Sequence, residues 1–185
     1  MITTNDFKTG QTIQHDGNLY VVLEFQHVKP GKGSAFVRSK LRNLRTGSVT
    51  EKTWRAGEKV ETAMIEKHKM QYSYNDNDMY IFMDLETYEQ LQIPKEKIEY
   101  QLNFLKEMME VNVIMFENEI LGVDLPEKVT LKVVDTVPGV RGNTVTNATK
   151  DATLETGYLV QVPLFIENGD DIIVSTQTGK YNTKA

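Results

Sequence analysis

Short runs of β-branched and aromatic residues, each bounded by turn-forming residues, fill most of this 185-residue chain. Such runs are typical of β-strands, because these side chains pack well on a pleated sheet. A mainly β fold is therefore predicted, with breaks near residue 65 and near Pro126. These breaks give three compact β modules, over residues 1–64, 65–127 and 128–185. Outside the two hairpins described below, strands are predicted over residues 111–116, 120–123, 129–134, 159–166 and 171–176.

A long hairpin is predicted from residue 19 to residue 44. Two strands, 19–28 and 35–44, flank a tip made of Lys29, Pro30, Gly31, Lys32, Gly33 and Ser34. Since strand side chains alternate between faces, the second strand separates its side chains into two sets. One set is Phe36, Arg38, Lys40 and Arg42, and the other is Ala35, Val37, Ser39 and Leu41. We expect the apolar set to pack inward and the cationic set to face outward.

A second hairpin is predicted over residues 70–83, with its turn at Asn75-Asp76-Asn77-Asp78. Four Asn and Asp residues in a row could also indicate a calcium loop. The segment lacks the glycine and the distal glutamate of such a loop, so a turn is favoured.

One segment departs from the strand pattern. After Pro94, the residues Ile98, Leu102, Leu105 and Met109 recur at helical spacing. Proline is common at the start of a helix. A single helix over Lys95–Met109 is therefore predicted.

Charge is distributed unevenly along the chain, which carries a net charge of −5. Residues 1–64 hold 10 basic and 6 acidic side chains, a net charge of +4, and the remaining residues hold 11 and 20, a net charge of −9. No acidic residue lies between residues 28 and 50, where six cations occur: Lys29, Lys32, Arg38, Lys40, Arg42 and Arg45. Such a cluster is either a solvated strand face or a surface that meets phosphate.

Several chemistries are excluded or unsupported. The chain has no cysteine, which excludes disulfides, thiolate zinc sites and cysteine nucleophiles. His15, His27 and His68 show no metal-ligand spacing, and Gly31-Lys32-Gly33 is not a phosphate-binding loop. We therefore expect no metal and no cofactor. No leader segment and no long apolar stretch is evident, so we expect a cytoplasmic protein that does not enter membranes.

Lys32 stands between two glycines at the predicted hairpin tip. It is either an ordinary solvated turn lysine or a probe carried outward on a thin support. A third role, as a Schiff-base nucleophile, would require burial or a cationic neighbour to lower its pKa. Because an exposed tip does the opposite, an enzyme is not predicted.

Three motifs in order resemble the bacterial translation elongation factor P family, which is related to the eukaryotic and archaeal factors that carry hypusine. The first is the hairpin from Val28 to Asn43. The second runs from Val134 to Thr144. The third runs from Lys150 through Val160-Gln161-Val162-Pro163 to Gly169.

The resemblance implies three small β-barrels, an N-terminal SH3-like (KOW-type) barrel and two OB-folds, in an L-shaped arrangement like that of tRNA. It implies binding to the 70S ribosome, with its 23S RNA and ribosomal proteins, between the peptidyl and exit sites. There Lys32 would approach the peptidyl-tRNA and relieve stalling at consecutive prolines. A loop containing Gly139, Arg141, Gly142, Asn143 and Thr144 would approach the small subunit. In many members an enzyme modifies the tip lysine.

From the residues we expect Arg38, Lys40 and Arg42, together with Lys29, to bind RNA phosphates and so deliver Lys32. A monomer is expected. The main alternative is a β-rich RNA-binding module that does not act on the ribosome.

Overall fold

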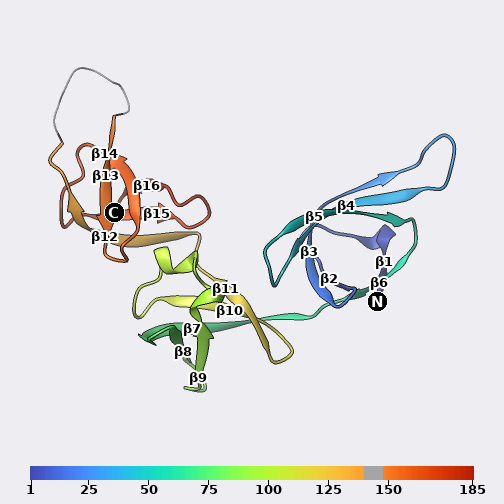
Figure 1. Cartoon of the computed structure of the whole chain (residues 1–185), viewed down its shortest axis with the longest axis horizontal. Coiled ribbons are helices and arrows are strands. Elements are labelled where there is room, and N and C mark those ends of the chain that lie inside the picture. The colour runs from blue at the N-terminus through green and yellow to red at the C-terminus, as the bar shows by residue number, and fades with distance from the viewer. Residues whose placement is uncertain (140–147) are drawn as a thin grey trace. The chain divides into compact units, whose positions relative to one another are not determined.

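The computed structural model describes residues 1–139 and 148–185, and strands dominate it (Figure 1). The prediction of a mainly β fold is confirmed. The predicted ranges miss seven strands, whose bounds follow: β1, β2, β5, β6, β9, β13 and β16. In the described residues no helix has the length and apolar character needed to cross a membrane.

The strands form three sheets. The first has the order β1-β6-β2-β3-β4-β5 and consists of β1 (Ile2–Thr3), β2 (Thr12–His15), β3 (Asn18–Val28), β4 (Phe36–Asn43), β5 (Val49–Arg55) and β6 (Lys59–Thr62). The second has the order β11-β10-β7-β8-β9 and consists of β7 (Ile65–Asp76), β8 (Met79–Asp84), β9 (Gln90–Pro94), β10 (Glu110–Phe116) and β11 (Glu119–Asp124). The third has the order β14-β13-β12-β15-β16 and consists of β12 (Lys128–Thr136), β13 (Thr149–Leu154), β14 (Leu159–Pro163), β15 (Asp171–Ser175) and β16 (Tyr181–Lys184).

Contacts divide the chain into two compact units. The first unit contains residues 1–67 and 114–122. Its main core lies against the first sheet and consists of Phe7, Ile13, Val22, Val37, Leu41, Trp54 and Val60. A smaller cluster of Leu19, Ala63 and Leu121 packs the segment 114–122 against the same unit. Burial of these apolar side chains is the main term that stabilises the unit.

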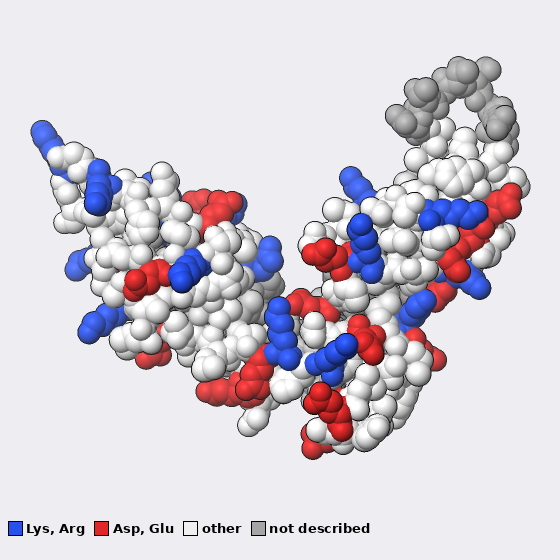
Figure 2. Space-filling view, turned by 180° about the vertical axis from the view of Figure 1, so that it is seen from behind, with Lys and Arg blue, Asp and Glu red and all other residues white. Residues whose placement is uncertain are grey.

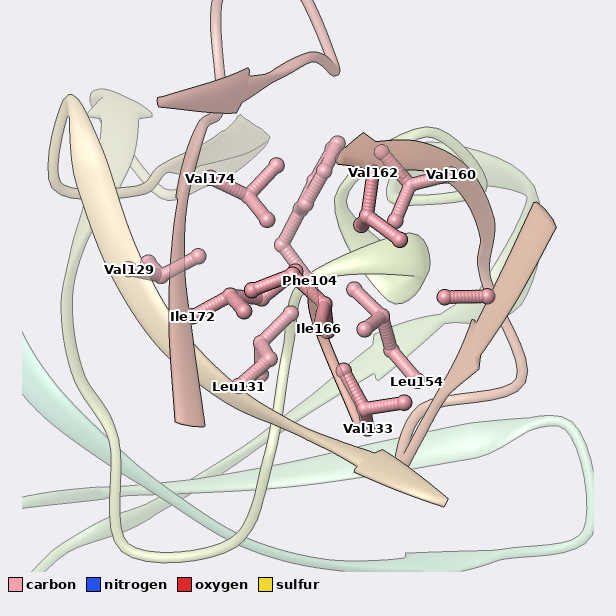
Figure 3. Close-up of a cluster of buried hydrophobic side chains, with 11 residues drawn as sticks. Phe104, Val129, Leu131, Val133, Leu154, Val160, Val162, Ile166, Ile172 and Val174 are labelled. Carbon is pink, nitrogen blue, oxygen red and sulfur yellow. The ribbon is translucent and has the colours of Figure 1, made fainter. Parts of the chain in front are cut away.

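The second unit contains residues 68–113 and 123–185. Phe104 is fully buried in its core, among Leu131 and Ile172 of the third sheet and Ile166 of the connection between β14 and β15 (Figure 3). The hydroxyl of Thr156 donates a hydrogen bond to the carbonyl oxygen of Asn103 at 2.6 Å, which holds the segment around Phe104 against the sheet.

The predicted helix over Lys95–Met109 is wrong. The segment contains two short 3-10 helices, η2 (Lys95–Lys97) and η3 (Gln101–Asn103), separated by a break at Ile98. Burial explains the difference, because Phe104, which lies outside the predicted apolar stripe, enters the core completely. Met108 then adopts a φ of +71°, which no right-handed helix accommodates.

The second predicted hairpin is confirmed, with a tighter turn than expected. Strands β7 and β8 pair as far as Asp76 opposite Met79, which leaves only Asn77 and Asp78 in the turn. Asn77 has a φ of +54°, a conformation that asparagine tolerates better than most residues.

Candidate nucleic-acid interface

The β3–β4 hairpin projects from the first sheet (Figure 1). Its ladder runs from Tyr20 opposite Asn43 to Val28 opposite Phe36. On its other side β4 pairs with β5, as far as Phe36 opposite Arg55. The seven residues from 29 to 35 lie beyond the last pair of β3 and β4. The hairpin therefore has a three-stranded root and a long terminal loop. We call the whole β3–β4 hairpin, with its loop, the finger.

The root of the finger is anchored in the core of the first unit. Val37, Ser39 and Leu41 are buried, while the cations that alternate with them are exposed, as predicted. The indole nitrogen of Trp54 donates a hydrogen bond to Ser39 Oγ at 2.8 Å, and Ser39 Oγ donates to the carbonyl oxygen of Lys52 at 3.1 Å. A buried and fully satisfied polar pair of this kind fixes the register between β4 and β5.

A β-bulge at Leu23 interrupts the ladder between β3 and β4. Val22 lies opposite Leu41 and Glu24 lies opposite Lys40, so Leu23 is the extra residue. The bulge falls where β3 changes from the buried Val22 to the exposed Glu24. Bulges bend and twist a strand and thereby direct the side chains beyond them.

The tip of the finger presents Lys32 to solvent. Gly31, Lys32, Gly33 and Ser34 are all exposed, and Lys29 is exposed as well, whereas Pro30 is half-buried. Gly33 has a φ of +102°, which a side chain would strain, so glycine is required there for the observed turn. Among the described residues, no hydrogen bond or ion pair to the Lys32 side chain is found. The amine is therefore free to contact a partner.

The cationic face of β4 is exposed along its length, at Arg38, Lys40 and Arg42. Figure 2 shows positively charged side chains out to the end of the finger and negatively charged ones only nearer the body of the unit. The register adds a residue that sequence reasoning misses. Arg55 of β5 lies opposite Phe36 and is exposed on the same face, and the alternation within residues 49–55 is the signal that could have found it.

Arg45 does not belong to this face. Its guanidinium donates hydrogen bonds to both carboxylate oxygens of Glu119, at 2.8 and 3.0 Å, and to the carbonyl oxygen of Gly17 at 2.9 Å. The hydrogen bonds to Glu119 raise the pKa of Arg45. Of the six cations between residues 28 and 50, Arg45 therefore has a structural role, and the other five are exposed.

The other predicted site, the loop of the third module, is described only at its start. Gly139 is exposed. Arg141, Gly142, Asn143 and Thr144 lie outside the described residues. Among the described residues, no group of three or more His, Asp or Glu side chains could hold a metal ion.

Comparison with known proteins agrees with this architecture. Three sequence models match in order: the elongation factor P KOW-like domain over residues 3–60, the elongation factor P OB domain over residues 65–123, and the elongation factor P C-terminal domain over residues 129–184. An elongation factor P of Moorella thermoacetica is 56% identical over 185 residues, which cover 100% of both chains. The chain belongs to the elongation factor P family. The resemblance found in the sequence is thereby confirmed, and the protein is a translation elongation factor.

Solved structures extend the relationship of the elongation factor P family beyond bacteria. Eukaryotic translation initiation factor 5A from Methanococcus jannaschii aligns with a TM-score of 0.52 at 30% identity, over 66% of this chain and 94% of that chain. A translation initiation factor 5A family protein from Naegleria fowleri aligns with a TM-score of 0.51 at 19% identity, over 67% of this chain and 96% of that chain. The second likeness shows a shared fold only.

Proposed function

We propose that this elongation factor binds the 70S ribosome between the peptidyl and exit sites and places Lys32 beside the acceptor end of the peptidyl-tRNA. By ordering that end it raises the rate of peptide-bond formation and relieves stalling at consecutive prolines. One observation carries the proposal. Lys32 is an exposed amine in the middle of a seven-residue loop at the end of a hairpin whose root is anchored in a packed core.

The proposed mechanism needs no chemical group from the protein. Holding two reactants in attack geometry can lower a barrier by as much as ~7–11 kcal/mol in favourable cases. A tenfold gain in rate requires only about 1.4 kcal/mol of stabilisation that is specific to the transition state. A single ammonium group placed against the tRNA backbone could supply this amount, since hydrogen bonds to charged groups contribute about 1.5–3 kcal/mol. The factor would thus act without being an enzyme.

The cationic face of the finger would supply the binding energy that brings Lys32 to its target. Arg38, Lys40 and Arg42 are exposed on one face, and Lys29 adds a charge at the tip. Contacts of this kind release counterions from RNA and make the affinity depend on salt. The contacts would be to the 23S RNA and to the peptidyl-tRNA.

The remaining partners follow from the charge and accessibility of the other parts. Residues 65–185 carry a net charge of −9, so in the proposal they meet ribosomal proteins rather than RNA. The loop with Gly139, Arg141, Gly142, Asn143 and Thr144 would face the small subunit. The division into domains at 1–64, 65–127 and 128–185, a cytoplasmic location and a monomeric state belong to the same proposal. The exposed Lys32 is also accessible to a lysine-modifying enzyme.

The test is Lys32→Ala in a reconstituted translation assay on a template that encodes consecutive prolines. We expect the stimulation of peptide-bond formation to fall by about tenfold or more. Stability should not change, because the side chain is exposed in a loop. Lys8→Ala, which removes an exposed lysine elsewhere in the first unit, is the matched control and should keep the stimulation. Full stimulation by Lys32→Ala would contradict the mechanism.

Two further measurements separate this proposal from its alternatives. Co-sedimentation with ribosomes distinguishes a ribosomal factor from an RNA-binding module that acts elsewhere. Intact-mass measurement with peptide mapping of the native protein shows whether Lys32 is modified.

A further inference from the structure

The three cations of β4 lie in different electrostatic surroundings. Lys40 is opposite Glu24 on β3 and opposite Glu51 on β5, so it stands between two exposed carboxylates. All three residues, together with Arg38, line one hollow in the surface. Register neighbours on one face have Cβ atoms only about 4.5–5.5 Å apart.

The arginines on either side of Lys40 have no acidic register partner. Arg38 lies between Gln26 and Thr53, and Arg42 lies between Val21 and Val49. Arg55, diagonal to Arg38 on the same face, strengthens the positive potential at the end nearer the tip. The face therefore has cations without acidic register partners at its two ends and, at its centre, a cation with two. The ends are separated by roughly 13 Å, the length of four strand residues.

The bulge at Leu23 creates this arrangement. If β3 continued regularly from Val22 opposite Leu41, Leu23 would lie opposite Lys40 and Glu24 would lie opposite the buried Ser39. The extra residue moves Glu24 to the outer face, because one inserted residue exchanges the two faces of all that follow. A carboxylate is thus placed beside the central cation by a specific irregularity of the strand.

A phosphate in contact with Lys40 would also lie within the Debye length, about 8 Å at physiological salt, of both carboxylates. Their repulsion opposes the attraction of the lysine, so the centre of the face gains little from an arbitrary phosphate. Arg38 and Arg42 lie diagonal to these carboxylates rather than opposite them, so they lose less of their attraction. An RNA surface binds well only when its phosphates reach both ends of the face.

We propose that Glu24 and Glu51 are specificity-determining residues that neutralise Lys40 and suppress the binding of arbitrary RNA to the finger. The inference rests on the proposed contact of this face with RNA. The carboxylates reduce affinity for any single run of phosphates, and selectivity for a surface that fits both cationic ends rises as a result.

The experiment measures the affinity of the full chain for a short RNA duplex of arbitrary sequence between 50 and 200 mM salt. Each phosphate contact adds roughly 0.7–0.9 to the slope of log affinity against log salt. The double variant Glu24→Gln/Glu51→Gln should gain about one contact. From 50 to 200 mM salt, the fold loss of affinity should then be about three times larger for the double variant than for the original chain.

A double-mutant cycle tests whether Lys40 is the cation that becomes available to RNA when Glu24 and Glu51 are replaced. In the original chain, Lys40→Gln should lower the slope by less than half as much as Arg42→Gln does. In the Glu24→Gln/Glu51→Gln background the two substitutions should lower it equally. Glu61→Gln is the control for net charge, since Glu61 is an exposed carboxylate on β6, which β2 separates from β3. It should leave the slope unchanged.

Four results would overturn the inference: equal effects of Lys40→Gln in both backgrounds, a slope that the double variant does not change, a steeper slope with Glu61→Gln, or no binding to the duplex at all. If Lys32→Ala still relieved stalling at consecutive prolines, the proposed function would be refuted instead. The double-mutant cycle, which measures RNA affinity, could still be interpreted. Thermal unfolding of each variant confirms that the fold is kept.

Discussion

The β3–β4 hairpin and the β7–β8 hairpin are both long antiparallel pairs, and each carries a bulge on its first strand. The extra residue is Leu23 in β3 and Ser73 in β7. Beyond the bulges the two hairpins differ. Strands β3 and β4 end in a loop of seven residues, whereas β7 and β8 end in a turn of two.

The neighbouring strand determines how close to its tip each hairpin is held by backbone pairing. Met79, the first residue after the turn of the second hairpin, pairs with Pro94 of β9, and the amide of Lys95 donates to the carbonyl oxygen of Asp78 at 2.9 Å. In the finger, the pairing of β5 with β4 ends at Phe36, and the amide of Ala56 donates to the carbonyl oxygen of Ala35 at 3.2 Å. The loop from residue 29 to residue 34 extends past this contact. Similar strands therefore produce a fixed turn in one place and a free probe in the other, according to loop length and the reach of the next strand.

The tips also differ in charge. The finger carries Lys29 and Lys32 with no acidic residue from 25 to 50, while the second tip has Asp78 in its turn and Asp76 at the end of β7. A cationic tip suits a phosphate partner, and an acidic one repels it. Of the two tips, that of the finger is therefore the one whose charge suits the RNA contact proposed above.

The largest expected effect comes from removing the support beneath the finger. Trp54 is buried, contacts Phe7 edge-on with ring centroids 5.8 Å apart, and satisfies Ser39. Trp54→Ala should lower the free energy of unfolding by about 3–5 kcal/mol, since it leaves a large cavity. Urea unfolding measures the loss. A loss below about 1 kcal/mol, the usual size for an ordinary point substitution, would show that the root is not held by this packing.

A pair of substitutions at the two tips sharpens the comparison directly. Asn77→Val places a β-branched residue at a φ of +54° in a turn that cannot relax, and should destabilise the protein by about 1–2 kcal/mol. Gly33→Val, at a φ of +102°, should cost less than about 0.5 kcal/mol, because a seven-residue loop can rearrange. Thermal unfolding measures both. Gly33→Val should nevertheless reduce the stimulation of translation, since the loop would aim Lys32 differently. Equal losses of stability at the two tips would show that the finger loop is as constrained as the turn.

The smallest effects concern one surface ion pair from each unit. Arg45 binds Glu119 through two hydrogen bonds, with side chains 34% and 39% exposed, whereas Lys69 meets Glu110 at a single 3.0 Å contact with side chains 69% and 48% exposed. Glu119→Gln should cost up to about 1 kcal/mol and Glu110→Gln about 0.2 kcal/mol, the two ends of the range for exposed pairs. Both losses should shrink in high salt. Urea unfolding at two salt concentrations measures them, and the reverse order would indicate that bidentate geometry adds no stability here.

The sequence alone determined those features that depend on local periodicity and turn chemistry. The alternation along β4 predicts correctly that Val37, Ser39 and Leu41 are buried and that the cations between them are exposed. Glycine, proline and asparagine mark the ends of both hairpins. Because side chains alternate between faces along a single strand, this burial pattern is predictable without knowing which strand pairs with it.

Tertiary structure decided everything that depends on a partner distant in sequence. The apolar spacing of residues 98–109 resembles a helix, yet burial of Phe104 against the third sheet breaks it into two 3-10 helices. Arg45 is withdrawn from the cationic group by Glu119, which lies 74 residues away. Lys40 lies between two carboxylates only because β3 bulges at Leu23 and β5 pairs with β4 in one register. Register and packing are settled by the whole core at once, and for this reason no local pattern shows which charges of the finger remain available to a ligand.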